Sequence, residues 1–187
     1  YARMKIESEK FILNMADNLF CPTILRLATV FGESPRMRFD LVINTLTVKA
    51  IKEGKITIFG GDQWRPNVHV GDVARAIIAV LEAPIEKVNK QIFNVGSEKN
   101  NYTIKQIGDQ VKEVIPSTEL VIEKKDIDQR DYEVDFAKIK SVLGFQPLMS
   151  VTDGIKEIAS SLNKGNYKDY KEAKYYNNLQ YKNHFKK

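Results

Sequence analysis

The sequence lacks the patterns that mark several large classes of protein. With one cysteine, Cys21, and two histidines in 187 residues, it can form no internal disulfide, and we expect no metal site. No apolar run is long enough to span a bilayer, none at the start resembles a signal peptide, and no glycine-rich phosphate-binding turn is present. A content of 43% hydrophobic and 28% charged residues is typical of a globular protein, and the lone thiol favours a cytoplasmic one.

The net charge of +5 is confined to one end of the chain. Residues 163–187 contain seven lysines and five of the eight tyrosines but only two acidic residues, so the first 162 residues carry no net charge. A groove that binds nucleic acid would need basic residues on the folded body. We therefore expect a solvated or surface-wrapping C-terminal segment, with no nucleic-acid or membrane partner. An RNA-binding arm is the alternative, because proteins that bind single strands also interleave aromatic and basic residues.

Apolar periodicity and turn residues predict helices and strands that alternate along the chain. Thr23–Phe31 is almost continuously apolar and β-branched, which is typical of a parallel strand buried on both faces. The alternation indicates an α/β fold, whose body (residues 1–162) is one compact unit or parts of two interleaved ones. Helices are expected at residues 2–19, 38–53, 72–83, 103–114, 135–144 and 150–162, and further strands at residues 56–59, 92–95 and 120–122.

Tyr1 and Lys5 form the strongest chemical signal in the sequence. Residues four apart share one face of a helix, so the Lys5 ammonium can lie beside the Tyr1 phenol. Such a cation favours the phenolate and turns a weak base into a group that can exchange a proton with a sugar hydroxyl. The Tyr-x-x-x-Lys pattern occurs twice more, at Tyr167 and Tyr170, where the polar surroundings indicate coincidence. The first pair differs because an amphipathic helix, a proline and an apolar strand follow it.

Several short motifs follow that pair, and their order along the chain is informative. The chain resembles, from Tyr1 to about Leu162, the second half of the extended short-chain dehydrogenase/reductases that act on nucleotide sugars, such as UDP-glucose 4-epimerase and sugar 4,6-dehydratases. Each motif is weak by itself, and their order makes the resemblance strong. The matching stretches are Leu25–Gly32 (LRLATVFG), Ile58–Arg65 (IFGGDQWR), Val68–Ala74 (VHVGDVA), Phe93–Ser97 (FNVGS), Asp128–Arg130 (DQR) with Val134–Asp135, and Leu143–Pro147 (LGFQP).

The resemblance implies a fold and a cofactor. The fold is the C-terminal part of a Rossmann-type parallel sheet, joined to a smaller α/β substrate-binding domain. The cofactor is NAD, or else NADP. Tyr1 is then the catalytic acid/base, Lys5 tunes it and holds the nicotinamide ribose, and Ala28 lies in the segment that closes over the nicotinamide.

The resemblance also implies a nucleoside-diphosphate sugar as substrate. Arg65 and the basic residues around Asp128 would hold the diphosphate, because a guanidinium presents a planar fork to phosphate oxygens. The family usually has Asn at Thr29, where the sugar is contacted, and Arg at Lys125, whose role Arg130 can take. The substrate-binding residues implied in this way are Thr29, Asp40, Leu41, Arg65, Lys125 and Arg130.

In intact members of that family, the glycine-rich turn, the acidic residue that binds the adenosine ribose and a Ser/Thr partner of the tyrosine all precede the catalytic tyrosine. We therefore expect this chain to be the back half of an enzyme. On that view, the 187-residue polypeptide alone neither binds NAD tightly nor turns over, and the intact protein is a homodimer.

Three functions of different kinds remain open. An NAD-dependent epimerase comes first, followed by a dehydratase or reductase on the same scaffold. A non-catalytic regulator that binds cofactor or protein partners is the second class, and a nucleic-acid-binding protein is the third. Arg26, His69 and Cys21 are expected to have structural roles, as a paired mid-strand cation, a satisfied histidine and an inert thiol.

Overall fold

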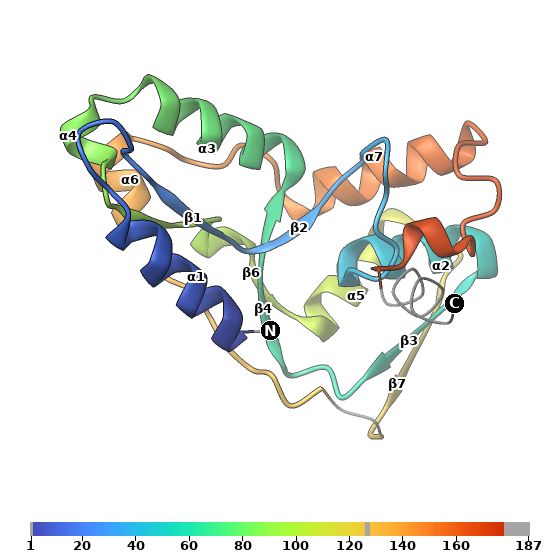
Figure 1. Cartoon of the computed structure of the whole chain (residues 1–187). Helices are drawn as coiled ribbons and strands as arrows, with labels where there is room; N and C mark the ends of the chain where they lie inside the picture. Colours follow the sequence, from blue (N-terminus) through green and yellow to red (C-terminus); the bar gives the residue numbers. More distant parts are fainter. Residues whose placement is uncertain (1, 126–127, 178–187) are drawn as a thin grey trace, which may run out of the picture.

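A computed structural model describes residues 2–125 and 128–177, and its helices and strands form two groups on either side of a short central sheet (Figure 1). One group contains α1, β1, α3, α4, β5 and α6, and the other contains α2, β3, α5, β7 and α7. The helices are α1 Ala2–Asn14, α2 Val42–Glu53, α3 Val70–Glu82, α4 Ile85–Val88, α5 Ile104–Val114, α6 Ala137–Leu143 and α7 Val151–Asn163, with short 3₁₀ helices at Glu98–Asn100 (η1) and Ala173–Tyr175 (η2). The strands are β1 Ile24–Leu27, β2 Thr29–Phe31, β3 Lys55–Phe59, β4 Trp64–His69, β5 Ile92–Val95, β6 Asn101–Thr103 and β7 Glu119–Glu123.

Parallel pairing dominates the strands. Strand β1 pairs with β5, β2 with β4, and β3 with β7, all in parallel, while β6 runs antiparallel to β4. In the central sheet Thr29 lies opposite Asn67, and Phe31 lies opposite His69. Helices separate most strands in sequence, so the predicted α/β fold with parallel strands is confirmed.

The chain crosses between the two groups several times. From β1 it passes through β2 to α2 and β3 of the second group, and it returns through β4 to α3 and β5 of the first group. It then crosses to α5 and β7, returns to α6 and crosses a last time to α7. Each group has its own core, one centred on Phe93 and Ile139 and the other on Ile56 and Ile155. Neither core is therefore built from one continuous stretch of sequence.

The stretch Thr23–Phe31 differs from its predicted form. It is divided at Ala28 into two strands of different sheets, and the Ala28 N–H donates to the Val95 carbonyl at 3.0 Å. The prediction that this stretch is buried on both faces was wrong, since Leu27 is 46% exposed. Within the described residues β1 has a single neighbouring strand, β5, which leaves its other edge and part of its surface uncovered.

The first two predicted helices are shorter than their apolar patterns suggested. Helix α1 ends at Asn14 because the Asp17 carboxylate accepts the backbone N–H groups of Leu19 and Phe20, both at 2.8 Å, in a turn. Helix α2 begins at Val42 and not at residue 38, because Arg38 and its neighbours form turns whose carbonyls bond to side chains of the helix's first turn.

The remaining predicted boundaries follow local capping chemistry. Thr103 and Ser150 each form a capping box, and Gly54 and Gly144 end their helices with left-handed φ angles of 67° and 64°. The helix predicted to begin at residue 135 begins at Ala137, as α6. The Asp135 carboxylate accepts the Ala137 N–H at 2.6 Å.

The three residues expected to be structural have structural contacts. The Arg26 guanidinium donates two hydrogen bonds, of 2.9 and 2.6 Å, to the carboxylate of Glu9 on α1. His69 is buried at the start of α3, where its Nδ1 accepts the Gly71 N–H at 3.2 Å and its Nε2 lies 2.8 Å from the Glu157 carboxylate. Both ring nitrogens of His69 therefore have a hydrogen-bond partner, as expected for a structural histidine. Cys21 forms no disulfide, and its partly buried thiol lies 3.8 Å from the Asp17 carbonyl oxygen, to which it donates.

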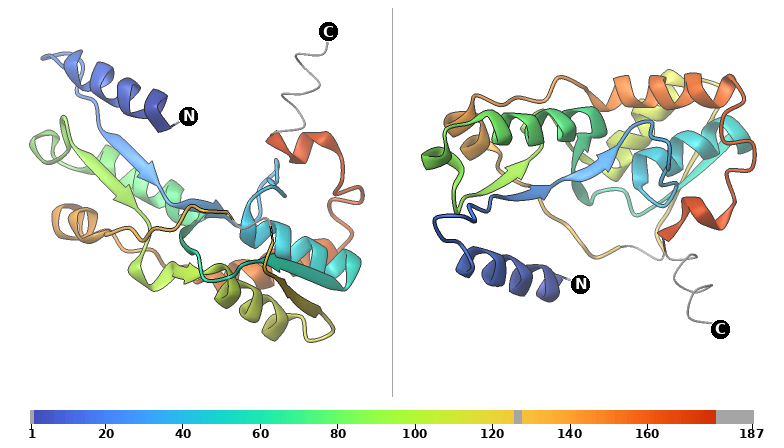
Figure 2. Two further views of the ribbon diagram at one scale, coloured as in Figure 1. Left: turned by 90° about the horizontal axis from the view of Figure 1, so that it is seen from below. Right: turned by 45° about the horizontal axis from the view of Figure 1, so that its top comes forward.

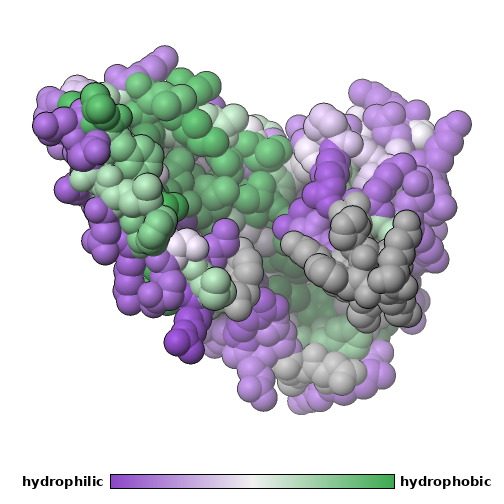
Figure 3. Space-filling view, in the orientation of Figure 1, coloured by the Kyte–Doolittle hydropathy of each residue, from purple (hydrophilic) through white to green (hydrophobic). Residues whose placement is uncertain are grey.

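Large apolar side chains remain exposed on the group that contains α1 and α3. Helix α1 has no buried residue and lies at the edge of the molecule in both views of Figure 2, with Met4 and Phe11 69% and 66% exposed. Ile78 and Leu81 of α3 are also exposed, and Figure 3 shows apolar surface over this part of the molecule. Among the described helices none combines the length and apolarity needed to cross a bilayer.

The part of the C-terminal segment that the structure describes packs against α2 and α7. Tyr170 and Tyr175 are only 9% and 8% exposed and share an apolar cluster with Phe39. Burial, with the nearby Glu33 carboxylate, raises the pKa of Tyr167 to about 12, and burial with the Glu53 carboxylate also raises the pKa of Tyr170. A proton shuttle requires the opposite shift. The two later Tyr-x-x-x-Lys patterns therefore involve structural tyrosines, and their surroundings are more apolar than the sequence suggested.

The raised pKa of Tyr167 predicts a loss of stability in alkali. An unfolded tyrosine ionises near 10, so the native state retains its proton where the unfolded state has lost it. The corresponding stability is fully present below about pH 10 and disappears as the pH rises through about 12. Urea unfolding across this range should show a falling free energy of unfolding, and Tyr167→Phe should reduce the fall. Parallel pH profiles for the two proteins would contradict this assignment.

Candidate functional site

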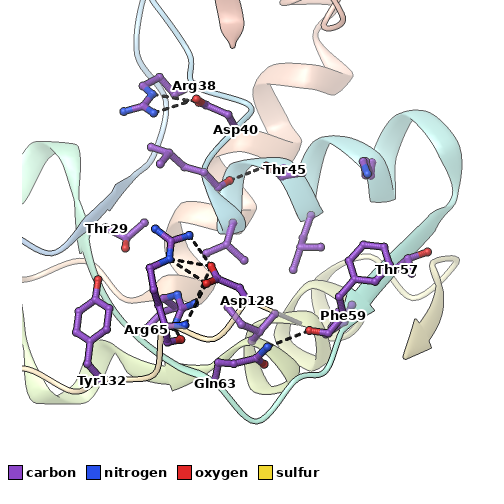
Figure 4. Close-up of a pocket in the computed structure, with 17 residues that line it drawn as sticks. Thr29, Arg38, Asp40, Thr45, Thr57, Phe59, Gln63, Arg65, Asp128 and Tyr132 are labelled. Carbon is purple, nitrogen blue, oxygen red and sulfur yellow. Dashed lines mark hydrogen bonds and ion pairs between the residues drawn. The ribbon is translucent and has the colours of Figure 1, made fainter. Parts of the chain in front are cut away.

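A cavity of about 540 Å³ opens between the start of α2, the end of β3 and the loop that follows β7 (Figure 4). Its volume falls in the range of cavities that enclose small-molecule ligands. Five of the six residues implied as substrate-binding lie in its wall. The lining residues are Thr29, Arg38, Asp40, Leu41, Val42, Thr45, Leu46, Lys49, Thr57, Ile58, Phe59, Gln63, Arg65, Ile104, Asp128, Arg130 and Tyr132.

The fold explains why residues so distant in sequence meet here. Thr29 follows the carboxyl end of β1, and Phe59 is the carboxyl end of β3. In open α/β sheets the crevice beyond the carboxyl ends of parallel strands is the usual place for a ligand. Gln63 shapes the turn after β3, because its side chain accepts the Gly61 N–H at 2.7 Å and donates to the Phe59 carbonyl at 3.1 Å. This turn leads the chain into β4 and places Arg65 at the cavity.

Arg65 and Arg130 converge on the carboxylate of Asp128, and Figure 4 shows Arg65 beside Asp128 in the cavity wall. Arg65 is 8% exposed, and its guanidinium lies 3.0 Å from Asp128 while also donating to the backbone carbonyls of Trp64 and Arg130. Arg130 binds the same carboxylate from the solvent side, with its side chain 77% exposed. The Arg130 hydrogen bond, aided by Arg65, holds the pKa of Asp128 well below its usual range. Asp128 is therefore charged at neutral pH and keeps two cations close together.

A second ion pair lies at the opposite wall. Arg38 donates to both carboxylate oxygens of Asp40, at 3.0 and 2.9 Å. Burial alone would raise the pKa of Asp40, but the Arg38 guanidinium and the Asn177 N–H bind its charged form and hold the pKa below its ordinary value. Both carboxylates of the cavity wall are thus paired with arginine.

The cavity wall carries an excess of positive charge. Four of its lining residues are cationic (Arg38, Lys49, Arg65 and Arg130) and two are anionic (Asp40 and Asp128). Since both anions are already paired with arginine, the surplus of two positive charges is available to a ligand. A dianionic ligand would complement this wall.

Sequence reasoning missed several lining residues. Val42, Thr45, Leu46 and Lys49 all come from α2 at spacings of three and four, so they share one helical face. That spacing, started from the predicted Leu41, could have identified Lys49. Gln63 and Tyr132 gave no comparable signal, because their positions depend on long-range contacts.

The other predicted site residues lie elsewhere. Lys125 does not line the cavity, and its ammonium lies 2.7 Å from the Glu123 carboxylate. Lys5 is on α1, and Ala28 is at the junction of β1 and β2; neither is among the lining residues. Tyr1 lies outside the described residues, so its distance from Lys5 stays a prediction.

Comparison with known proteins links the chain to enzymes of sugar nucleotides. The model of the NAD dependent epimerase/dehydratase family matches residues 1–96. A UDP-glucuronate 4-epimerase of Thermodesulfobacterium geofontis is 30% identical over 138 residues, which are 72% of this chain and 41% of that protein. UDP-glucuronic acid decarboxylase 3 of Arabidopsis thaliana is 28% identical over 137 residues, which are 70% of this chain and 39% of that protein.

A solved structure agrees with these relatives. The UDP-glucose 4-epimerase of Thermotoga maritima with UDP-glucose superimposes with a TM-score of 0.73 at 27% identity, covering 88% of this chain and 53% of that one. The chain therefore spans about half the length, or less, of the proteins that it matches.

The two arginines at Asp128 should contribute unequally to stability. Arg65→Met leaves two partly buried backbone carbonyls, those of Trp64 and Arg130, without their donor, and we expect a loss of about 1–3 kcal/mol in the free energy of unfolding. Arg130→Met removes an exposed ion pair and should cost less than about 1 kcal/mol. Urea unfolding of the two variants measures both values. Equal losses would mean that the hydrogen bonds of Arg65 to backbone carbonyls do not stabilise the fold more than the exposed Arg130 ion pair does.

Proposed function

Because the chain belongs to the NAD dependent epimerase/dehydratase family, we propose that it is the C-terminal portion of an NAD-dependent nucleotide-sugar epimerase. The cavity lined by Arg65 and Arg130 is its substrate site. The observation that carries this proposal is the meeting of Thr29, Asp40, Leu41, Arg65 and Arg130 in one cavity with two surplus positive charges. A nucleoside-diphosphate sugar carries two negative charges on its diphosphate and matches that surplus.

The arginines would bind the diphosphate. The guanidinium fork of Arg65 faces the cavity from a rigid strand, and Arg130 can turn toward a ligand because it is exposed. Each charge-assisted contact of this kind contributes about 1.5–3 kcal/mol. That binding energy, remote from the reacting carbon, would hold the sugar in position for chemistry. Thr29 would contact the sugar ring.

Ala28 and Gly96 directly follow the carboxyl ends of the neighbouring parallel strands β1 and β5, a position that fits the nicotinamide end of a dinucleotide. Tyr1, Lys5 and Ala28 would hold it there. A bound nicotinamide would supply reversible hydride transfer at a sugar carbon. Tyr1, tuned by Lys5, would take the hydroxyl proton as the hydride leaves and give it back on return. The glycine-rich turn for the dinucleotide phosphates is not in this sequence, and we assign it to the remainder of the protein.

We assign α1, β1, α3 and β5 to the end of a Rossmann-type domain, interleaved with a smaller substrate domain built on α2, β3, α5 and α7. Two features support this division. The uncovered edge of β1 and the exposed apolar side chains of α1 and α3 fit a sheet that continues into further strands and helices. On this view residues 1–162 form the body, and the intact protein is a homodimer.

A UDP-uronate decarboxylase on the same scaffold is the second candidate. A smaller cavity of about 140 Å³ adjoins the first, shares Arg38 and Leu41 with it and also contains Arg36. A guanidinium there suits a sugar carboxylate, and a relative of this kind was found in Arabidopsis thaliana. A dehydratase or reductase remains a third possibility of the same class. A non-catalytic regulator has no need of a tuned Tyr1.

The substrate site can be tested on the 187-residue chain itself. UDP should bind in isothermal titration calorimetry, and Arg65→Met should weaken binding by about tenfold or more, since one charge-assisted contact of about 1.5–3 kcal/mol is lost. Lys125→Met is the matched control, because that lysine lies outside the cavity and should leave the affinity unchanged. Absence of UDP binding by the unaltered chain, or equal effects of the two substitutions, would refute the proposed site.

The chemistry requires the intact enzyme with its upstream half. Incubation with UDP-glucose and UDP-glucuronate, followed by product analysis, should yield 4-epimers if the protein is an epimerase and UDP-pentose with CO₂ if it is a decarboxylase. Tyr1→Phe should lower kcat by about 10²–10⁴-fold, the usual contribution of a general acid/base, and change KM little. Unchanged turnover in Tyr1→Phe would rule out the assigned role of this phenol.

A further inference from the structure

We propose that the C-terminal strap, defined as residues 164–177, forms part of the substrate site. It acts by holding the cavity-wall segment, defined as residues 34–41, in its ligand-binding conformation. Tyr175 is the main positioning residue. The inference rests on the proposed function, since it concerns the same cavity, and it assigns to the basic, tyrosine-rich end of the chain a role that its composition did not suggest.

The cavity-wall segment has little structure of its own. It contains no helix or strand, and one internal backbone hydrogen bond, from Leu41 to the Arg38 carbonyl at 3.4 Å, is found within it. A segment with so few internal bonds takes its conformation from its neighbours. Yet it supplies Arg38, Asp40 and Leu41 to the cavity wall, so its conformation determines the shape and charge of that side of the cavity.

The strap supplies hydrogen bonds that the cavity-wall segment lacks. The Phe39 N–H donates to the Tyr175 carbonyl at 3.0 Å, and the Asn177 N–H donates to the Asp40 carboxylate at 3.2 Å. The Arg36 guanidinium donates to the Asn177 side-chain oxygen at 3.0 Å. At the other end of the segment, the Tyr167 hydroxyl donates to the Ser34 carbonyl at 2.9 Å. These contacts span the segment from one end to the other.

Aromatic packing fixes the middle of the same segment. The Phe39 ring is fully buried, and the rings of Tyr167, Tyr170 and Tyr175 meet it edge-on with centroid separations of 5.7, 6.2 and 5.4 Å. Edge-to-face pairs of this kind add about 0.5–1.5 kcal/mol each beyond the burial of apolar area. Phe39 lies next to Asp40, so the packing that anchors the ring also fixes the carboxylate that pairs with Arg38.

This arrangement links the strap to ligand affinity. If the cavity-wall segment is ordered for only a fraction of the time, the measured dissociation constant rises by the inverse of that fraction. Loosening the segment to about 10–20% occupancy of its present conformation would weaken binding about five- to tenfold without removing any residue that touches the ligand. The buried rings of Tyr170 and Tyr175 are also withdrawn from the base stacking that a nucleic-acid-binding arm would need.

The test uses the 187-residue chain and UDP as the probe. Tyr175→Ala should raise the dissociation constant for UDP about five- to tenfold in calorimetry and speed hydrogen–deuterium exchange in residues 34–41. Tyr175→Phe keeps the ring, so its dissociation constant and exchange rates should match those of the unaltered chain. Ile139→Val, a substitution in the core of the other group of elements, is the stability control and should leave UDP affinity unchanged.

A second pair of variants guards against misfolding of Tyr175→Ala. Both substitutions of Asn177 remove the side-chain oxygen that binds Arg36, but only Asn177→Pro also removes the backbone N–H that binds Asp40. We therefore expect Asn177→Pro to weaken UDP binding more than Asn177→Ala does. Unchanged affinity in Tyr175→Ala and Asn177→Pro, in a chain that binds UDP, would overturn the role of the strap and leave the proposed function intact. An unaltered chain that fails to bind UDP would overturn the proposed function and this inference together.

Discussion

The cavity depends on one carboxylate that keeps two arginines side by side. Without Asp128, the guanidinium groups of Arg65 and Arg130 would repel each other, and the exposed Arg130 would move into solvent. With it, both remain at the cavity, and the wall keeps its surplus of positive charge. An ion pair buried on one side and open on the other can exchange partners, because an incoming phosphate offers the arginines the same oxygen geometry that Asp128 does.

The fold serves this arrangement by crossing repeatedly between its two groups of elements. The crossings bring distant segments to the cavity: the β1–β2 junction, the start of α2, the turn after β3 and the loop after β7. Hydrogen bonds hold two of these junctions in place, from the Ala28 N–H to the Val95 carbonyl and from the Gln63 side chain within the turn after β3. The cavity-wall segment contains no helix or strand. Side chains of α2 bind its Arg38 and Phe39 carbonyls, and the C-terminal strap binds it through the Tyr175 carbonyl and the Asn177 N–H.

Local chemistry made much of the fold predictable. Strand Ile92–Val95 and the capping boxes at Thr103 and Ser150 agree with their sequence signals, because apolar runs, turns and caps act over a few residues. The uncovered surface of Leu27 was not predictable, since it depends on how many strands flank β1.

Some residues of the candidate site were predictable from the sequence and others were not. Arg65, Arg130 and Thr29 came from family resemblance, which carries long-range information that periodicity lacks. The packing of Tyr175 on Phe39 joins residues more than a hundred positions apart, so composition alone suggested only a basic tail.

A crystal structure of the chain with UDP-glucose or UDP-glucuronate would show whether the two arginines bind the diphosphate. We expect diphosphate oxygens within about 3 Å of the guanidinium groups of both Arg65 and Arg130, with the sugar directed toward Thr29. A nucleotide bound elsewhere, or a diphosphate that leaves both arginines on Asp128 alone, would contradict this expectation.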